Sequence, residues 1–167
     1  MVDQSRTRFD FAHPKPLSSK EVVKIENLVN QSIRSNESVQ ARVMSYDKAI
    51  DTGAVALFGE KYGDEVRVIA MGGASTELCG GTHVKRTGDI GLFKITAETG
   101  VASGVRRIEA ITGQVALDYL HLRDKQFSDV ASLLRTSPDE TSDRLIQVLE
   151  NAKPVSYTHL RAHETRG

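Results

Sequence analysis

The residues best suited to chemistry are Cys79 and His83, which stand four positions apart in the run E-L-C-G-G-T-H-V. A thiolate and an imidazole are side chains that zinc prefers as ligands. Gly80 and Gly81 lie between them, lack Cβ atoms and tolerate positive φ, so the backbone can turn tightly enough to direct both side chains at one point. The spacing therefore predicts half of a metal site.

Two other interpretations of this pair remain open from the residues alone. Cys79 can be a small buried hydrophobic residue, as free cysteines often are. Cys79 and His83 can also form a nucleophile and its base, although the sequence offers no obvious third group nearby to orient the histidine.

Composition excludes several classes of protein. Lys and Arg together number 22 and Asp and Glu also number 22, so no global positive charge indicates nucleic-acid binding. A local basic patch is still compatible with this balance, because binding follows the placement of charge. The single cysteine excludes an internal disulfide and fits a reducing compartment. No apolar signal core or membrane-length run occurs, so we expect a cytoplasmic protein with no membrane partner.

The motif needs strands and helices around it, and hydrophobic periodicity predicts them. Ser18 and Glu21 form a capping box for a helix over about residues 19–34, and Ser45 is a candidate cap for a short helix through Ile50. Alternating apolar residues predict strands near 8–13, 39–43, 65–71, up to Cys79, 92–98 and 105–111. We expect an α+β fold in which a mixed or antiparallel sheet packs against helices and a helical extension follows.

The C-terminal third changes character. Residues 114–153 carry apolar side chains at helical spacing, and Ser137-Pro138 begins a second helix there. We favour a helical extension over a pair packed on the core of residues 1–113. Residues 154–167 do not continue the pattern and resemble a translated vector tail. His159 and His163 in that tail have metal-ligand spacing, but we exclude them together with the tail.

Several motifs in register resemble one known family. They are R-F-D-F-A-H, A-L-F-G-E-K-Y-G-D-E-V-R-V, the cysteine–histidine run and S-G-V-R-R-I-E-A-I-T-G. From about Arg6 to Gly113 the chain resembles the editing region of bacterial alanyl-tRNA synthetases. This second additional domain also occurs in threonyl-tRNA synthetases and free-standing alanyl editing proteins. The later helices resemble the dimerisation and tRNA-contacting region that follows it.

The resemblance implies a zinc site that hydrolyses seryl or glycyl esters on the alanine tRNA. Cys79 and His83 match the second half of the family's ligand set. The other half, an upstream H-x-x-x-H pair, and the ATP-dependent aminoacylation domain are expected before residue 1. The resemblance also implies the acceptor end of tRNA(Ala) as partner and a homodimer through the C-terminal helices of the parent. We therefore expect a fragment of a synthetase. The alternatives are a non-catalytic tRNA-binding and dimerisation module or part of a free-standing editing hydrolase.

Other residues take candidate roles from this resemblance. The hydroxyl of Thr82 is a candidate contact for the aminoacyl group, or else it bonds its own turn. Basic side chains offer candidate tRNA contacts, with solvated surface charge as the alternative. Asp10 and His13 are candidates for supporting the metal ligands, with structural hydrogen bonding as the alternative. We take His121 as a surface residue. The candidate tRNA contacts are Lys85, Arg86, Arg106 and Arg107.

Overall fold

The computed structural model describes residues 2–3, 5–56 and 62–164, with side chains through residue 152. The chain divides into two compact units, Met1–Leu117 and Asp118–Gly167, and each is described by itself. The predicted α+β class is confirmed: antiparallel sheets pack against helices. The part of the run A-L-F-G-E-K-Y-G-D-E-V that occupies residues 57–61 lies outside the described residues.

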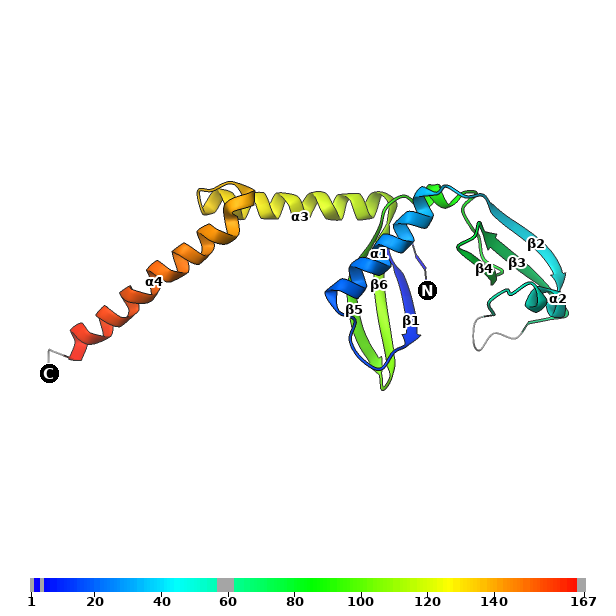
Figure 1. Cartoon of the computed structure of the whole chain (residues 1–167), viewed down its shortest axis with the longest axis horizontal. Coiled ribbons are helices and arrows are strands. Elements are labelled where there is room, and N and C mark those ends of the chain that lie inside the picture. The colour runs from blue at the N-terminus through cyan, green and yellow to red at the C-terminus, as the bar shows by residue number, and fades with distance from the viewer. Residues whose placement is uncertain (1, 4, 57–61, 165–167) are drawn as a thin grey trace. The chain divides into compact units, whose positions relative to one another are not determined.

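The strands form two sheets instead of the single sheet that the sequence predicts. One sheet has the order β1-β6-β5 and the other has the order β2-β3-β4, and neighbouring strands in both are antiparallel (Figure 1). Their bounds are β1 Thr7–Ala12, β2 Val39–Ser45, β3 Glu65–Met71, β4 Ser75–Leu78, β5 Phe93–Ala102 and β6 Val105–Thr112. The helical elements are α1 Ser19–Arg34, α2 Tyr46–Asp51, α3 Gly113–Leu133 and α4 Thr141–Glu164, with 3-10 turns η1 Thr87–Ile90 and η2 Pro138–Glu140.

Helix α1 begins where its capping box predicts. The Ser18 hydroxyl oxygen accepts from the backbone N–H of Glu21, and the Glu21 carboxylate accepts from the backbone N–H of Ser18. These bonds satisfy amide groups that an uncapped helix start would leave open. The apolar side of α1 then packs on the β1-β6-β5 sheet through Val22 and Ile25, against buried Ile95, Ile108 and Ala110.

Two polar side chains of α1 also bind the outer edge of β5. The side-chain amide of Asn30 donates to the carbonyl of Phe93 and accepts from its N–H, both at 2.9 Å. Glu26, one helical turn earlier, accepts from the N–H of Ile95 at 2.8 Å and from Lys94 Nζ at 3.0 Å. Because positions four apart share one helix face, α1 supplies bonds that a further strand would otherwise make.

Removing the Asn30 side chain tests this edge contact. Asn30→Ala breaks two hydrogen bonds to the strand backbone, so the free energy of unfolding is expected to fall by about 1–3 kcal/mol. Asn27→Ala on the same helix is the matched control, because Asn27 is exposed; its expected effect is within about 0.5 kcal/mol. Urea unfolding followed by circular dichroism measures both. Equal unfolding midpoints for the two variants would contradict the contact.

The second sheet packs its core against α2 and the segment that follows it. Val66 and Val68 of β3 and Leu78 of β4 are buried together with Ala49 and Ala54. The α2 helix follows Ser45 as expected, although the Ser45 side chain makes no capping hydrogen bond. Leu78 is 1% exposed and is the last residue of β4, so this core fixes the position at which the cysteine–histidine run begins.

The C-terminal unit is helical, as the sequence predicts. The η2 turn begins with Pro138, and the Ser137 hydroxyl donates to the Glu140 carboxylate instead of capping a backbone group. The backbone of α4 stays helical through Glu164, beyond Pro154, where the sequence pattern was expected to stop. No helix among the described residues is long and apolar enough to cross a membrane.

Candidate functional site

The cysteine–histidine run leaves the second sheet directly after β4, one residue earlier than predicted. The N–H of Leu78 donates to the carbonyl of Val55 at 3.0 Å, and the N–H of Cys79 donates to the carbonyl of Arg67 at 3.0 Å. These bonds lie on opposite sides of the chain. The two hydrogen bonds fix the backbone position of Cys79 and therefore the origin of its side chain.

Arg67 also holds the turn from its side chain. Its guanidinium Nη1 donates to the carbonyl of Cys79 at 3.1 Å and to the carbonyl of Gly81. Because guanidinium presents several N–H donors in a fixed plane, one side chain can satisfy two carbonyls of a tight turn. Sequence reasoning missed Arg67, and the signal that identifies it is register: Val68 pairs with Leu78 on β4, which places Arg67 beside Cys79.

The donor chemistry of the turn fits a metal ion. Cys79 is a half-buried free thiol. His83 is half-buried, and its Nε2 atom is fully buried with no hydrogen-bond partner in the described part of the chain. An unpaired buried nitrogen costs free energy, which coordination to a metal would recover. Within residues 2–3, 5–56 and 62–152, no three or more His, Cys, Asp or Glu side chains are grouped to hold a metal. Cys79 and His83 therefore fit a metal ion as half of its set of protein ligands.

The two glycines act differently from the prediction. Neither Gly80 nor Gly81 adopts positive φ. A Cβ atom on Gly81 would lie 3.6 Å from Cys79 Sγ, and one on Gly80 would meet nothing within 4 Å. Because Gly80 and Gly81 have no side chains, the approach to the cysteine sulfur stays open. The turn does not require a left-handed backbone conformation.

A hollow of about 260 Å³ opens beside the cysteine. Its walls come from β3, from the start of the turn and from residues just before β3. They are Tyr62, Gly63, Glu65, Val66, Arg67, Leu78, Cys79 and Gly80. Thr82 is exposed, and its hydroxyl makes no hydrogen bond within the described part of the chain, so the alternative of a hydroxyl bonded to its own turn is not observed.

The candidate tRNA contacts beside the turn have different partners. The Arg86 guanidinium donates to the carbonyl and the side-chain Oδ1 of Asn36, the latter at 3.0 Å. Lys85 is exposed, and within the described part of the chain only its backbone carbonyl accepts a hydrogen bond, from the N–H of Val39. Of the two side chains, the ammonium of Lys85 is therefore the more available for a phosphate.

Arg106 and Arg107 each face a carboxylate. Arg106 pairs with Glu98 on β5, and its Nη2 lies 2.7 Å from Oε2. Arg107 pairs with Asp10 on β1 through two bonds of 2.7 and 2.8 Å. The structure thus shows Asp10 in a cross-strand ion pair, matching its structural alternative.

The histidines outside the turn have ordinary surroundings. His13 Nδ1 lies 2.7 Å from the carbonyl of Lys15, and the His13 ring lies against Phe11 with centroids 6.0 Å apart. His121 is exposed. The side chains of His159 and His163 lie outside the described residues, so their exclusion stays a prediction.

The two ion pairs predict a pH dependence of stability. Hydrogen bonds from Arg106 lower the pKa of Glu98 below its usual 4.5, and hydrogen bonds from Arg107 lower the pKa of Asp10 below its usual 3.8. A carboxylate with a lowered pKa stabilises the fold above its unfolded-state pKa, and this contribution is lost as pH falls. Acidification from about pH 6 to pH 3 is expected to lower the urea midpoint, and Glu98→Gln and Asp10→Asn should each flatten that decline. A decline of equal size in both variants and the unmodified chain would contradict these pairs.

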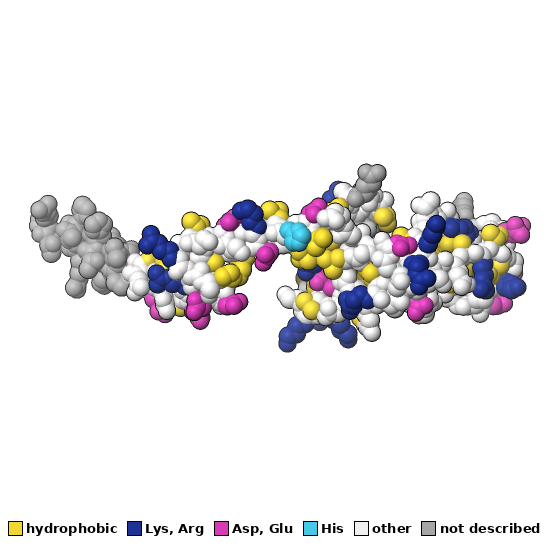
Figure 2. Space-filling model, turned by 90° about the horizontal axis from the view of Figure 1, so that it is seen from above, with side chains coloured by type: hydrophobic (Ala, Val, Ile, Leu, Met, Phe, Trp, Pro, Cys, Tyr) yellow, Lys and Arg dark blue, Asp and Glu magenta, His cyan; other side chains and the backbone are white. Residues whose placement is uncertain are grey.

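Charge is mixed on the face of the molecule that Figure 2 shows. Basic and acidic side chains both occur along this face, with hydrophobic side chains between them. This face shows no single dominant basic patch.

Comparison with known proteins identifies the domain around the turn. Residues 66–109 match the model of the family described as threonyl and alanyl tRNA synthetase second additional domain. The match runs from β3 through the cysteine–histidine turn into β6. The fold and the turn thus define a protein that carries this domain.

Longer matches point to one group within that class. The chain is 56% identical over 154 residues to the alanine–tRNA ligase of Aromatoleum aromaticum, which is 92% of this chain and 18% of the relative. It is 55% identical over 155 residues to that of Bordetella petrii and 51% over 155 residues to that of Nitrosomonas eutropha, in each case 93% of this chain and 18% of the relative. The chain belongs to the alanine–tRNA ligase family and spans about one fifth of the length of these relatives.

Proposed function

We propose that this chain supplies half of a zinc-dependent editing site that hydrolyses seryl or glycyl esters attached to tRNA(Ala). The observation that carries the proposal is the buried Nε2 of His83, which has no hydrogen-bond partner among the described residues and lies four positions from the free thiol of Cys79. The turn lies within the segment that matches the synthetase domain. Because a pocket rejects one small amino acid against another only by roughly 10- to 200-fold, a second hydrolytic site is the physical remedy.

Three residues of the turn and Arg67 on β3 have proposed roles. Cys79 and His83 would bind the metal, with the remaining ligands supplied by the H-x-x-x-H pair of the parent. When bound, zinc would supply a Lewis acid for the ester carbonyl or for water. The hydroxyl of Thr82 would contact the aminoacyl group, and Arg67 would fix the turn through the carbonyls of Cys79 and Gly81.

The wider activity of the parent protein belongs to the same proposal. The parent protein would attach alanine to tRNA(Ala) with ATP, and an aminoacylation domain outside this segment would bind the ATP. The parent would act in the cytoplasm, and α3 and α4 would belong to its dimerisation and tRNA-contacting region.

Cobalt(II) titration tests the metal half-site without requiring turnover. A thiolate ligand gives cobalt a charge-transfer absorption, so the chain is expected to develop this band and Cys79→Ala to lose it. His83→Ala should bind cobalt at least 10-fold more weakly, since it removes one of two ligands. His121→Ala is the matched control, because His121 is exposed on α3. Cobalt binding that is equal in all four proteins would overturn the half-site.

The competing function is a non-catalytic tRNA-binding and dimerisation module. It is favoured by the absence of a third ligand near Cys79 and His83 within the described residues, and by exposed apolar side chains such as Phe127 and Leu133 on α3. Hydrolysis of seryl-tRNA(Ala) by the chain separates the two functions. Hydrolysis that disappears in Cys79→Ala supports editing, whereas tRNA binding that is unaffected by Cys79→Ala and occurs without hydrolysis supports the module.

A further inference from the structure

The far end of the cysteine–histidine run is joined to the segment between α1 and β2. We call this contact of residues 85–87 with residues 36–39 the junction, and it begins two residues after His83. Three backbone contacts in series make it. They are the N–H of Val39 with the carbonyl of Lys85 at 2.9 Å, the antiparallel bridge of Ser38 with Arg86, and the N–H of Thr87 with the carbonyl of Glu37 at 2.9 Å.

Two side chains reinforce the junction. Thr87 is 4% exposed, and its hydroxyl oxygen accepts from the N–H of Glu37 and donates to the carbonyl of Ser32, both at 2.9 Å. The exposed Arg86 guanidinium donates to the carbonyl and to the side-chain Oδ1 of Asn36. Thr87 therefore holds the junction from its buried side, and Arg86 holds it from its exposed side.

The backbone and the neighbours of Asn36 suit this contact. Asn36 has a φ of 52°, in the left-handed region, which asparagine adopts more readily than most residues. Gly88 lies so close that a Cβ atom there would be 2.5 Å from Asn36 Oδ1. A side chain at position 88 would therefore displace the oxygen that Arg86 binds.

His83 lies midway between two anchored positions. On one side Arg67 binds the carbonyl of Gly81, and on the other side the junction binds the carbonyl of Lys85. Within the described part of the chain, the backbone groups of residues 82–84 make no hydrogen bond. Because each peptide unit is planar, few backbone rotations separate the imidazole from either anchor. The two anchors together set its position.

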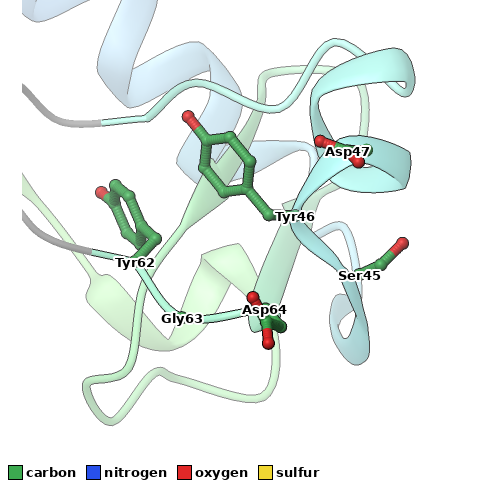
Figure 3. Close-up of a pocket in the computed structure, with 6 residues that line it drawn as sticks. All are labelled: Ser45, Tyr46, Asp47, Tyr62, Gly63 and Asp64. Atoms are coloured by element: carbon green, nitrogen blue, oxygen red, sulfur yellow. The ribbon is translucent and has the colours of Figure 1, made fainter.

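The two hollows on the Cys79 side of the run do not supply this support. The larger one, about 510 Å³, lies at the end of β2 and the start of α2, where the Tyr46 and Tyr62 rings stack (Figure 3). The smaller one reaches Cys79 and Gly80. Neither His83 nor any residue of the junction is among the described residues that line these two hollows.

We propose that Arg86 is a positioning residue for His83: its bonds to Asn36 hold the junction, and the junction directs Nε2 of His83 toward the metal. The metal in this inference rests on the proposed function. The charge of Arg86 made it a candidate phosphate contact, but its guanidinium is engaged by a carbonyl and a neutral side chain of the same chain. Removing it therefore acts on the binding site through His83.

Cobalt(II) binding by the 167-residue chain tests this role. Arg86→Ala leaves Cys79 and His83 in place but loosens the junction, so cobalt affinity is expected to fall about 10-fold while the thiolate charge-transfer band remains. Arg42→Ala on β2 is the matched control, because it removes an exposed arginine whose bond among the described residues is to Gln40. Its cobalt affinity should be unchanged.

A double-mutant cycle separates positioning from a general loss of stability. In the His83→Ala background, Arg86→Ala should change cobalt affinity by no more than about 2-fold, because the side chain that it positions is gone. An equal loss of affinity in both backgrounds would overturn the inference. Equal affinity of Arg86→Ala and the unmodified chain would also overturn it and would leave the editing proposal standing.

A metal-free measurement keeps the inference distinct from the proposed function. Diethyl pyrocarbonate acylates accessible imidazoles, and peptide mass spectrometry locates the product at His83. Since Nε2 of His83 is buried, Arg86→Ala is expected to raise the acylation rate about 3- to 10-fold by opening the junction, and Arg42→Ala should leave it unchanged. If the unmodified chain binds no cobalt, the editing proposal fails and this rate decides the inference. A faster rate in Arg86→Ala then supports positioning of His83, and equal rates contradict it.

Discussion

Replacing Leu78 with alanine is expected to lower the free energy of unfolding of the chain by about 2–5 kcal/mol. The side chain is 1% exposed and packs with Val66, Val68 and Ala49 in the core of the second sheet. Its removal leaves a cavity at the end of β4, in addition to the loss of buried apolar surface. Since Leu78 directly precedes Cys79, the same cavity is expected to loosen the start of the cysteine–histidine turn.

Matched substitutions separate burial from residue type in this experiment. Leu78→Met preserves volume and is expected to cost less than about 1.5 kcal/mol. Leu28→Ala, at a position 55% exposed on α1, is expected to change stability by no more than about 0.5 kcal/mol. Urea unfolding followed by circular dichroism measures all three. If Leu78→Ala unfolds at the same urea concentration as Leu28→Ala, Leu78 is not part of this core.

Replacing Arg67 with alanine is expected to weaken cobalt binding by about 10- to 100-fold, because side chains that support metal ligands commonly have effects of this size. The substitution removes the hydrogen bonds to the carbonyls of Cys79 and Gly81 and leaves the proposed ligands Cys79 and His83 in place. The turn can then adopt other conformations, and the metal must select the competent one. Cobalt titration of the unmodified and variant chains gives the ratio directly.

Two further arginine variants define what the turn requires. Arg67→Lys keeps the charge but lacks the planar set of donors, so its metal affinity should fall nearly as far as that of Arg67→Ala. Arg42→Ala on neighbouring β2 removes an exposed side chain that bonds only Gln40 among the described residues, and its affinity should be unchanged. A loss in Arg42→Ala as large as that in Arg67→Ala would indicate a general effect of charge.

Local patterns were sufficient to predict most elements of the first unit. The capping box at Ser18 and Glu21 and the apolar spacing of α1 act within a few residues, and so does the alternation in β3. The grouping of six strands into two sheets depends on pairings across long stretches of chain, such as β1 with β6. Nothing in the local alternation specifies that partner.

The candidate site could be proposed from the sequence where it is local, and its tertiary contacts could not. Cys79 and His83 lie in one turn, so their spacing alone was sufficient to propose them as candidate ligands. Arg67 reaches the turn only through the pairing of β3 with β4. The partners of Arg86 and Arg107, which are Asn36 and Asp10, are 50 and 97 positions away and follow from the tertiary fold alone.

The bonds from Glu26 and Asn30 to β5 have a consequence beyond stability. An uncovered outer strand displays a row of N–H and C=O groups that another polypeptide can pair with, which is a route to aggregation. Here the groups of Phe93 and the N–H of Ile95 are already bonded by a helix of the same chain. A helix that covers this edge as soon as it docks protects the sheet from intermolecular pairing, so Asn30→Ala should precipitate sooner than Asn27→Ala when both are held at equal concentration near their unfolding midpoints.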